Sequence, residues 1–482
     1  MSGSLLIFLL CTRPSFPDRQ RARAGGTAAW LLLSLFGLGC GDVFRPVAQP
    51  IPLPSPNPAA VHFVASVSTN GILDDGALSR IDVSGDSLSS VVQTGLAPVH
   101  AAMTPSGTRI YVANAGEDTI SSNNVSTTAP ATTIALTQLC DASGCAPSQP
   151  VFVHSTENNK MYAANSGNGS VAVINTGSDV VVATVPVDPA FGASPRPLPN
   201  RAARPVALAE TPDSTKLYVA NQGNGTVTSI STVDDTVLKV IKVGASPVWA
   251  VARADSARIY VLDASGAIYV INTLSDTVMS STASAGAGAN FIFYDKVLNR
   301  LYVTNPTTAQ VSIFTAATDP PVPLSGSPVA IGVAPSSPCS SAVVPNSVEA
   351  LGDGSRAYVA SYQRDPSGAV CTQVSVIATG TNTLSKAIAL SQSTEAAQTG
   401  CASARFRVFI TSSGGGAAPI FKVYVSQCDS GGVAIIDTFA DNTGANPHAS
   451  DVVMATLQAP LSSRPGNPMP PPQNPVFLVA GP

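Results

Sequence analysis

One phrase recurs along this chain, and each copy has the pattern of a β-hairpin. The copies are RIYVANAGEDTISSNN from Arg109, KMYAANSGNGSVAVINT from Lys160, KLYVANQGNGTVTSIST from Lys216, RIYVLDASGAIYVINT from Arg258 and RLYVTNPTTAQVSIFT from Arg300. Each contains an apolar strand, a turn and a second strand. In two copies an Asn-Gly pair supplies the positive φ that tight hairpins need. Self-similarity of this kind predicts a repeat architecture in which neighbouring copies bury one another.

Two further strands flank each hairpin, so the predicted unit has four strands, A to D. Strand A precedes the hairpin in APVHAAM, RPVALAE and SPVWAVA, and strand D follows it in DVVVATVPV and DTVLKVIKV. In AIYVINT, residues 267–273, apolar residues occupy both faces, although an antiparallel hairpin normally keeps one face wet. Because no helix is predicted to cover the second face, radial stacking of small sheets as blades is the arrangement that buries both.

The YVAN and YVTN strands, the Asn-Gly turn, the VAVINT strand and the valine-rich strand D resemble the repeats of YVTN β-propellers. That family is linked to bacterial surface-layer and periplasmic proteins. The resemblance spans residues 61–457 and is strongest over 205–316. It implies an all-β propeller of four-stranded antiparallel blades, with the A strands lining a central channel. Members of the family commonly have seven blades.

The residue at the tyrosine position of strand B marks each blade. The sequence predicts eight blades, or seven if one unit is merged, from Phe63, Tyr111, Tyr162, Tyr218, Tyr260, Tyr302, Tyr358 and Tyr424. The first blade has no upstream strand A, whereas NPHASDVVMA at 446–455 resembles a strand A without a strand B after it. We therefore predict that a C-terminal strand A closes the ring without an exposed sheet edge.

The N-terminal residues 1–39 have the pattern of a signal segment. Arginines up to Arg23 precede the apolar run from Thr27 to Gly39, which ends directly before Cys40. This resembles a bacterial lipoprotein signal, in which Cys40 is lipidated, although Gly37 stands where that family usually has leucine. An ordinary signal peptide or an N-terminal anchor is the alternative. The remaining predicted parts are a Pro-rich tether at 40–60, the propeller at 61–458 and a Pro-rich tail at 459–482.

The lipoprotein resemblance implies a protein of the bacterial cell envelope that contacts the membrane through its lipid anchor only. Because Gly41, not aspartate, follows Cys40, it implies sorting to the outer membrane, with the propeller in the periplasm or at the cell surface. Charged residues make up 11% of the chain and the net charge is −4, so no basic surface for nucleic acid is expected. We expect a monomer.

The cysteines indicate disulfides in an oxidising compartment. Eight are present, and setting aside Cys11 and Cys40 leaves an even number. In the four-strand unit the D–A connection and the B–C hairpin lie on the same rim, which predicts the pairs Cys339–Cys371, Cys401–Cys428 and a local Cys140–Cys145. Each longer bridge should contribute roughly 3 kcal/mol by restricting the unfolded chain. Metal binding is the competing interpretation, but no CxxC pair is present.

No hydrolase, zincin or nucleotide motif of the types GxSxG, HExxH, Walker A or GxGxxG between a strand and a helix is present. Paired carboxylates at Asp74-Asp75 and Asp234-Asp235 fall beside predicted turns, where aspartate caps the backbone. The sequence therefore predicts structural rather than catalytic roles for these pairs.

Three of the four histidines, His100, His154 and His448, lie in predicted A strands and thus beside the channel. Three imidazoles on adjacent inner strands would suit zinc, copper or iron. Their offsets from the proline that begins each strand differ, which favours solvated or hydrogen-bonded histidines, and no cofactor is predicted. Trp249 has the offset of His100 and is predicted to be a packing aromatic, with a ligand platform as the alternative.

Two functions fit these features. The first is an envelope-anchored binding or scaffold protein whose rim contacts an envelope protein, a glycan or a small ligand. The predicted insertions 135–150, 188–204, 317–345 and 391–418 all fall in D–A connections and would crowd one rim. The alternative is an enzyme at the channel mouth, a lactonase-like hydrolase or metal-dependent oxidoreductase, by fold analogy alone. Convergent histidines or carboxylates in the channel would favour the enzyme, and an apolar, blocked channel the binding protein.

Overall fold

The computed structural model describes residues 63–70, 75–127, 129–141, 144–188, 201–279, 282–394, 400–413, 422–440, 449–458 and 474–481. All of them belong to one compact unit, residues 56–482. The predicted signal segment, Cys40, the tether and His448 lie outside the described residues, as do His62 and residues 459–473 of the predicted tail.

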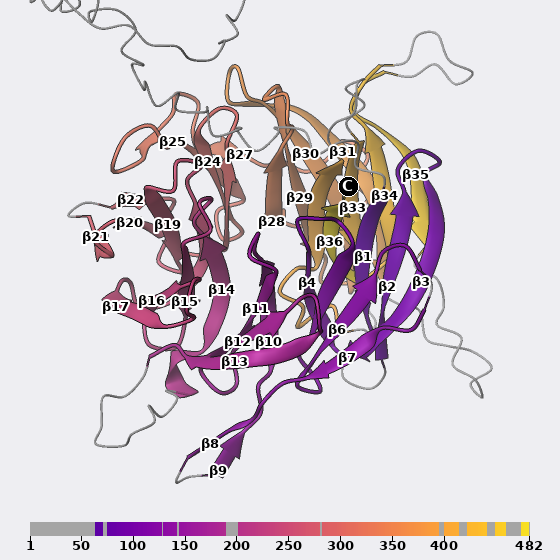
Figure 1. The fold of residues 1–482 in the computed structure, drawn as a ribbon. Helices are drawn as coiled ribbons and strands as arrows, with labels where there is room; N and C mark the ends of the chain where they lie inside the picture. Colours follow the sequence, from indigo (N-terminus) through magenta and orange to yellow (C-terminus); the bar gives the residue numbers. More distant parts are fainter. Residues whose placement is uncertain are drawn as a thin grey trace, which may run out of the picture. The chain divides into compact units, whose positions relative to one another are not determined.

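Within the described residues, the strands form eight antiparallel blades (Figure 1), as predicted. From strand A to strand D, blades 1 to 4 contain β36 (Asn474–Gly481), β1 (Phe63–Thr69), β2 (Asp75–Asp82) and β3 (Ser87–Leu96); β4 (Pro98–Met103), β5 (Arg109–Asn114), β6 (Thr119–Asn124) and β7 (Thr132–Ala135); β10 (Pro150–Ser155), β11 (Lys160–Asn165), β12 (Ser170–Asn175) and β13 (Val180–Pro186); β14 (Pro205–Glu210), β15 (Lys216–Asn221), β16 (Thr226–Ser231) and β17 (Val237–Lys242).

The second half of the ring has the same plan, except that strand D of blades 5 and 6 is split into two short pieces. Blades 5 to 8 contain β18 (Pro247–Ala252), β19 (Arg258–Asp263), β20 (Ala267–Asn272), β21 (Thr277–Val278) and β22 (Ala283–Ser284); β23 (Phe291–Asp295), β24 (Arg300–Asn305), β25 (Gln310–Thr315), β26 (Val322–Pro323) and β27 (Val329–Ala330); β28 (Val344–Ala350), β29 (Arg356–Arg364), β30 (Ala369–Ala378) and β31 (Thr383–Thr394); β32 (Val408–Ser413), β33 (Lys422–Gln427), β34 (Gly432–Asp437) and β35 (Val452–Gln458).

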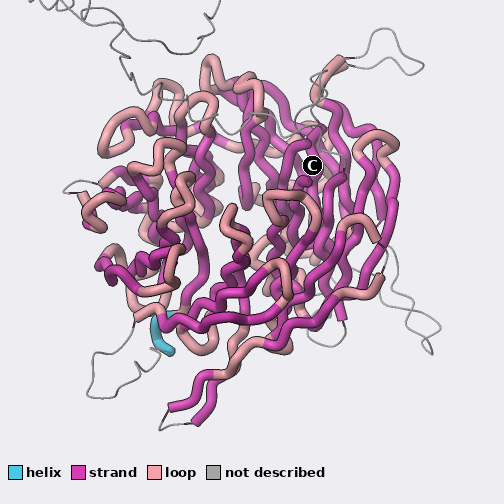
Figure 2. Tube along the Cα trace, in the orientation of Figure 1, coloured by secondary structure: helices cyan, strands magenta, loops and turns pink. Residues whose placement is uncertain are grey.

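The blades pack face to face around the channel. Successive A strands contact one another in a closed cycle, β36, β4, β10, β14, β18, β23, β28, β32 and back to β36. Strands B and C are buried on both faces, as in β15 and β12, whereas β17 and β13, the strands D of those two blades, carry exposed residues. Figure 2 shows that strands and loops make up almost all of the described chain, with one short 3-10 helix, η1 (Arg201–Ala203). No helix in the described part of the chain has the length and apolar composition needed to cross a bilayer.

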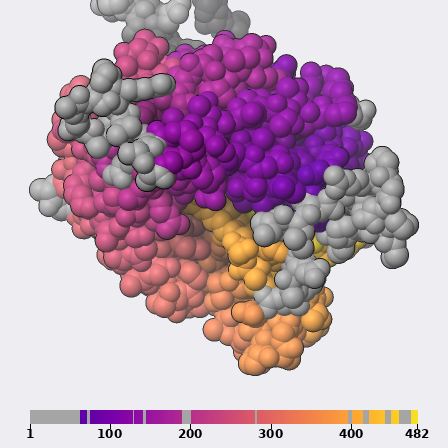
Figure 3. Space-filling model, turned by 90° about the horizontal axis from the view of Figure 1, so that it is seen from below, coloured from indigo at the N-terminus to yellow at the C-terminus, as the bar shows by residue number. Residues whose placement is uncertain are grey.

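The C-terminus closes the ring, but with a different strand from the one that the sequence predicts. The predicted strand at 446–455 ends in β35, which pairs with β34 as the outer strand of blade 8. Strand A of blade 1 is instead β36, within the predicted tail, and it pairs with β1. In Figure 3 the N-terminal and C-terminal parts of the described chain accordingly meet side by side. Since β36 contains no histidine, the placement of His448 on this strand was wrong.

The register also corrects the tyrosine position of blade 1. Tyr218 of β15 lies opposite Ala209 of β14, and the matching pair in blade 1 is Ala65 with Val479. Ala65 therefore occupies the tyrosine position, and Phe63 occupies the position of Lys216, two residues earlier. The prediction that Phe63 occupies the tyrosine position was wrong, because that position holds an alanine and Phe63 is the aromatic residue nearest to it.

A polar contact, the inter-blade triad, joins strand B of one blade to the C–D turn of the next. Lys216 Nζ lies 2.7 Å from Asp276 Oδ2, and the Tyr218 hydroxyl donates to Oδ1 of the same carboxylate. Complete triads of a cation, a tyrosine and an aspartate recur three times: Arg109, Tyr111 and Asp179; Lys160, Tyr162 and Asp235; Arg356, Tyr358 and Asp451. Three further junctions keep the cation and its acceptor: Arg258 with Asp319, Arg300 with Asn382 and Lys422 with Asp86.

The turn explains why aspartate or asparagine supplies the acceptor. At Asp276, for example, φ is +50°, a left-handed conformation that Asp and Asn adopt more readily than most residues. Burial, followed by the hydrogen bond to the aspartate, raises the pKa of Tyr218, so its hydroxyl remains a donor at physiological pH. The junction from blade 1 to blade 2 has Phe63 and Ala65 at the two strand-B positions, and neither side chain can form these bonds.

Three disulfides join the residues that the sequence predicts. Cys339–Cys371 and Cys401–Cys428 close separations of 32 and 27 residues and tie D–A connections to blades 7 and 8. Cys140–Cys145 joins the two short strands of a separate hairpin, β8 (Leu139–Asp141) and β9 (Gly144–Ala146), which projects from the ring in Figure 1.

Candidate functional site

One position of strand A directs side chains toward the channel. It is the residue whose partner in strand B lies two residues after the tyrosine position. In blades 1 to 8 these residues are Phe477, His100, Phe152, Ala207, Trp249, Phe291, Ser347 and Phe409. Six of the eight carry a ring, and all eight are buried. The inner wall at this level is therefore mostly aromatic, and we call it the channel ring.

The rings contact one another around the wall. His100 stacks on Phe152 with 3.9 Å between ring centroids and lies 4.1 Å from Phe477. Beyond the small Ala207 of blade 4, the Phe152 and Trp249 centroids are 5.3 Å apart, with a 72° angle between the ring planes. Edge-to-face and offset contacts of this kind add about 0.5–1.5 kcal/mol per pair to the burial of the rings.

A seventh ring, Phe406, fills the centre of the channel ring. It comes from the D–A connection between blades 7 and 8 and is 3% exposed. Its centroid lies 5.6 Å from Trp249, 5.8 Å from Phe291, 4.7 Å from Phe409 and 6.0 Å from Phe477. Because those four partners belong to blades 5, 6, 8 and 1, Phe406 closes the channel at this level.

Arg405 fixes the chain beside Phe406. Its guanidinium lies over the Trp249 ring, 4.3 Å from the centroid, and donates to the carbonyl oxygens of Val206 at 2.6 Å and Val248 at 2.5 Å. Register shifts in β14 and β18 leave Val206 and Val248 without cross-strand partners. Partial burial lowers the pKa of Arg405, but the residue keeps an exposed surface and its guanidinium remains charged at neutral pH.

Both ends of this connection are also tied down. We call residues 400–407 the plug segment. Cys401 is bridged to Cys428, and the buried Arg407 forms a bidentate ion pair with Asp429, with Nε–Oδ2 and Nη2–Oδ1 distances of 2.6 and 2.7 Å. Bidentate guanidinium–carboxylate pairs hold a fixed geometry. The plug segment is thus anchored to blade 8 at both ends and to blades 4 and 5 through Arg405.

His100 is a packing residue of the channel ring. Burial, followed by the nearby Arg405 and His154, holds the pKa of His100 well below its usual range, so the ring is neutral. Its Nδ1 lies 3.4 Å from the backbone nitrogen of Val153, in a position to accept from that N–H. The lone pair of His100 Nδ1 therefore points toward the backbone N–H of Val153.

His154 lies elsewhere in the channel, two residues further along its strand than the ring position. Its Nε2 is 3.2 Å from Glu210 Oε2 on the neighbouring strand A. His100 and His154 therefore sit at different depths, while His448 lies outside the described residues. In the part of the chain that the structure describes, no group of three His, Cys, Asp or Glu side chains could hold a metal ion.

Glu349 of β28, on a strand A of the channel wall, is a carboxyl group with a raised pKa. Its Oε1 accepts from the backbone nitrogen of Ser412 at 3.1 Å and from the Ser412 hydroxyl at 2.7 Å. Burial raises the pKa of Glu349 to about 7, although the hydrogen bonds from Ser412 act in the opposite direction. Glu349 therefore links blades 7 and 8 across the channel wall.

The mouth beside the plug segment is shallow. A cavity of about 90 Å³ lies between the plug segment and the first residues of blades 1 and 2, including Pro98, Val99 and Val476. Pockets for small-molecule ligands usually measure about 300–1,000 Å³. The closed mouth is therefore too small to enclose a typical substrate.

The D–A connections gather on the rim of the plug segment, with two corrections to the predicted insertions. Residues 136–149 and 187–204 connect strand D to strand A, as expected for the first two. The third predicted insertion, 317–345, contains the two pieces of strand D of blade 6, β26 and β27, and only 331–343 is the D–A connection. The fourth predicted insertion, 391–418, instead contains strand A of blade 8, β32, and runs into the A–B connection that follows it.

Sequence reasoning identified Trp249 and its shared offset with His100, but it missed the plug. Aligning all eight A strands would have revealed the channel ring, because the aromatic residues share one register position. Arg405 and Phe406 occur once, outside the repeats, and their partners come from four other blades. Nothing in the local sequence indicates those contacts.

No protein-family model matches the chain. No curated protein matches it either. Among solved structures, similarity is found to hydrazine synthase from Kuenenia stuttgartiensis, with 15% identity, a TM-score of 0.43, and coverage of 64% of this chain and 87% of that one. The dihydro-heme d1 dehydrogenase NirN gives 13% identity and a TM-score of 0.49, over 70% of this chain and 66% of that one. A Bacteroides fragilis protein assigned as a putative 6-phosphogluconolactonase gives 15% identity and a TM-score of 0.48, over 68% of this chain and 96% of that one. These similarities identify no substrate or reaction for this chain.

Proposed function

We propose that this protein is a non-catalytic binding protein of the bacterial cell envelope that recognises its partner with the D–A rim. The closed channel mouth is the observation that carries the proposal. A small-molecule site needs a concave pocket with a few convergent polar groups. Here the corresponding place is filled by the channel ring and Phe406, which leaves the rim itself as the surface available for recognition.

Disulfides on this rim support the same function. The D–A connections at 331–343 and 400–407 are each tied to the next blade by one of the two longer disulfides. Ser336 and Ser403 are exposed on these connections. A surface ordered before binding loses less conformational entropy when a partner docks. The two bridges therefore suit a recognition surface.

Site-specific photo-crosslinking in the native host tests the proposal. A photoreactive amino acid at Ser336 or Ser403 should give a discrete adduct with an envelope component. The same amino acid at Ser275, exposed in a C–D turn on the opposite rim, is the matched control and should give none. Equal yields from the three positions, or an adduct from Ser275 alone, would contradict recognition by the D–A rim.

The alternative of an enzyme at the channel mouth requires the plug to open. Substitution Phe406→Ala removes the ring that fills the centre and should expose the channel. Turnover of a lactone or a redox substrate by the purified protein, increased by this substitution, would favour the enzyme over the binding protein. With the photoreactive amino acid at position 403, a folded Ser336→Arg variant that crosslinks like the parent would argue against the rim in the same way.

Membrane attachment through Cys40 is part of the proposal and has its own test. Metabolic labelling with a palmitate analogue should mark the wild-type chain, and Cys40→Ser should abolish both the label and the cleavage of the precursor. Globomycin should cause the wild-type precursor to accumulate. Processing that is unchanged by the substitution would show that the leader is not a lipoprotein signal.

A further inference from the structure

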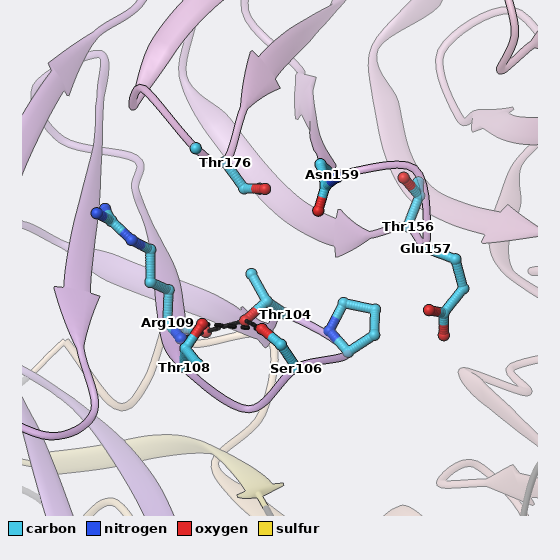
Figure 4. Close-up of a pocket in the computed structure, with 10 residues that line it drawn as sticks. Thr104, Ser106, Thr108, Arg109, Thr156, Glu157, Asn159 and Thr176 are labelled. Atoms are coloured by element: carbon cyan, nitrogen blue, oxygen red, sulfur yellow. Dashed lines mark hydrogen bonds between the residues drawn. The ribbon is translucent and has the colours of Figure 1, made fainter.

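A second recess lies on the opposite rim, between blades 2 and 3. Its volume is about 360 Å³, within the range of small-molecule sites. The A–B turns 104–108 and 156–159 form two of its walls, and Thr176 of the C–D turn forms a third (Figure 4). We call it the inter-blade pocket. It shares no residue with the plug segment or the D–A rim.

The inter-blade pocket is open because its two A–B turns are not joined. At the next junction, Asn158 Nδ2 donates to the Ser214 carbonyl at 3.1 Å. At the one after that, the Asp213 backbone nitrogen donates to Ser256 Oγ at 2.9 Å. Among the described residues, no hydrogen bond connects the turn at 104–108 to the turn at 156–159. Hydrogen bonds between neighbouring A–B turns therefore close the gap between blades 3 and 4 and between blades 4 and 5, whereas the gap between blades 2 and 3 stays open.

The inter-blade triad below the pocket fixes its shape. Arg109 is paired with Asp179, and the Tyr111 hydroxyl donates to the Thr176 carbonyl at 3.2 Å. These contacts hold the C–D turn of blade 3 against strand B of blade 2. Because Asp179 already neutralises the charge of Arg109, the arginine contributes a rigid wall rather than a free cation.

The lining is rich in groups that both donate and accept hydrogen bonds. Five of the lining residues carry a hydroxyl group: Thr104, Ser106, Thr108, Thr156 and Thr176. Those of Thr104 and Thr156 are bonded to backbone atoms of their own turns, whereas the side chains of Ser106 and Thr108 are exposed. The Ser106 hydroxyl lies 3.2 Å from that of Thr104 and 2.8 Å from that of Thr108, and Figure 4 shows these three together on one wall. The exposed hydroxyls of Ser106 and Thr108 can rotate their protons to suit a ligand with its own hydroxyls.

One charged group in the pocket is without a partner in the described residues. Glu157, on the wall opposite Ser106, is exposed and forms no hydrogen bond or ion pair there. An ionised carboxylate only accepts hydrogen bonds, and its two oxygens can accept from two neighbouring hydroxyls at once. The free charge of the pocket is negative, which disfavours phosphates, nucleotides and acidic sugars.

We propose that the inter-blade pocket binds a neutral carbohydrate of one or two sugar units, with Glu157 accepting from a pair of adjacent sugar hydroxyls. Its size matches such a ligand, its hydroxyl lining complements a polyhydroxylated surface, and its charge excludes anionic competitors. Pro105 supplies the pocket with an apolar ring. With no aromatic platform in the lining, the affinity is weak, with a Kd on the order of 1 mM. The site operates independently of the D–A rim.

Saturation-transfer NMR and titration test this site. The neutral probes are methyl α-glucoside, methyl β-galactoside, N-acetylglucosamine and maltose, and the anionic probes are glucuronic acid and glucose 6-phosphate. At least one neutral probe should bind saturably. Glu157→Gln and Ser106→Ala should each weaken that binding about fivefold, the effect of losing one hydrogen bond. Ser355→Ala, in the A–B turn of blade 7 and outside the pocket, is the matched control and should bind like the wild type.

Three outcomes would overturn the proposal. The first is that no neutral probe saturates the protein up to about twentyfold the expected Kd. The second is that the anionic probes bind as tightly as the neutral ones. The third is that both pocket variants, with far-UV spectra like that of the wild type, retain wild-type binding. None of these results depends on whether the D–A rim has a partner.

Discussion

Substitution Asp235→Asn should weaken the junction between blades 3 and 4. Asp235 accepts from the Tyr162 hydroxyl at 2.6 Å on Oδ1 and from Lys160 Nζ at 2.8 Å on Oδ2. Its φ is +58°, which asparagine adopts as readily as aspartate, so the turn itself should persist. The substitution therefore removes the charge and one acceptor while it keeps the size and backbone of the turn.

The magnitude follows from the two bonds. An amide can accept from one donor, but its NH₂ group then faces the other. Hydrogen bonds to charged groups contribute about 1.5–3 kcal/mol each. The side chains of Lys160 and Asp235 are only 19% and 13% exposed, so water replaces little of the loss. Lys160 keeps its bond to the Thr232 carbonyl at 2.8 Å, which limits the cost. We expect the free energy of unfolding to fall by about 2–3 kcal/mol.

The neighbouring residue provides the control. Asp234 lies in the same turn but is exposed, and it accepts from the Thr236 hydroxyl at 2.9 Å. Guanidinium unfolding, followed by circular dichroism with a refolding check, should show no measurable change for Asp234→Asn. Adding Lys160→Met to Asp235→Asn should cost less than the sum of the single effects, because the unpaired ammonium is removed. Equal effects of the two aspartate substitutions, or an additive cycle, would refute the inter-blade triad as a stabilising contact.

Two other predictions follow from the channel wall and the rim. Between about pH 4.5 and 7, Glu349 in the folded protein retains a proton that it has lost in the unfolded chain, so raising the pH through this window lowers the free energy of unfolding. The variant Glu349→Gln should lose this pH dependence, which is worth at most about 3 kcal/mol. A variant whose stability follows the same pH profile as the wild type would contradict the prediction. Replacing Cys401 and Cys428 by alanine should lower the free energy of unfolding by roughly 3.5 kcal/mol. Replacing both cysteines of the β8–β9 hairpin should leave thermal unfolding of the propeller unchanged. Equal losses of stability from the two replacements would contradict the conclusion that the longer bridge stabilises the propeller.

The blades could be predicted from sequence because each repeats local signals. Strand B carries an apolar run with tyrosine, and two B–C turns end in Gly169 or Gly225 at positive φ, as the Asn-Gly pairs indicated. The inter-blade triad was also present in the repeats, as a cation two residues before the tyrosine and an aspartate in the C–D turn. Its function was not apparent, because the cation and the aspartate belong to different blades and meet only when the ring forms.

The ring closure and the plug were harder to predict for different physical reasons. Strand β36 carries Pro475-Val476 directly after its first residue, Asn474, and the same Pro-Val pair begins β14 of blade 4, but β36 stands alone after a Pro-rich stretch with no hairpin following it. The plug segment depends on contacts between residues far apart in sequence. Arg405, for instance, bonds to carbonyl groups about 160 and 200 positions away, and no periodicity encodes such contacts.

The closed channel can be measured directly through Trp249. The chain has two tryptophans, and Trp30 lies in the predicted signal segment, so Trp249 is the single tryptophan of residues 41–482. It is 7% exposed, in contact with Phe406 and beneath Arg405. Acrylamide quenching of its fluorescence therefore reports on access to the channel ring at the plug segment.

The wild type should show blue-shifted emission and slow quenching, and Phe406→Ala should shift the emission to longer wavelength and raise the quenching constant several-fold. Phe314→Ala is the matched control, because Phe314 is 1% exposed in the core but lies outside the channel ring. Either substitution of a buried phenylalanine costs about 3–5 kcal/mol, so stability alone does not distinguish them. Rapid quenching of Trp249 in the wild type, or quenching unaffected by Phe406→Ala, would contradict a channel closed by Phe406.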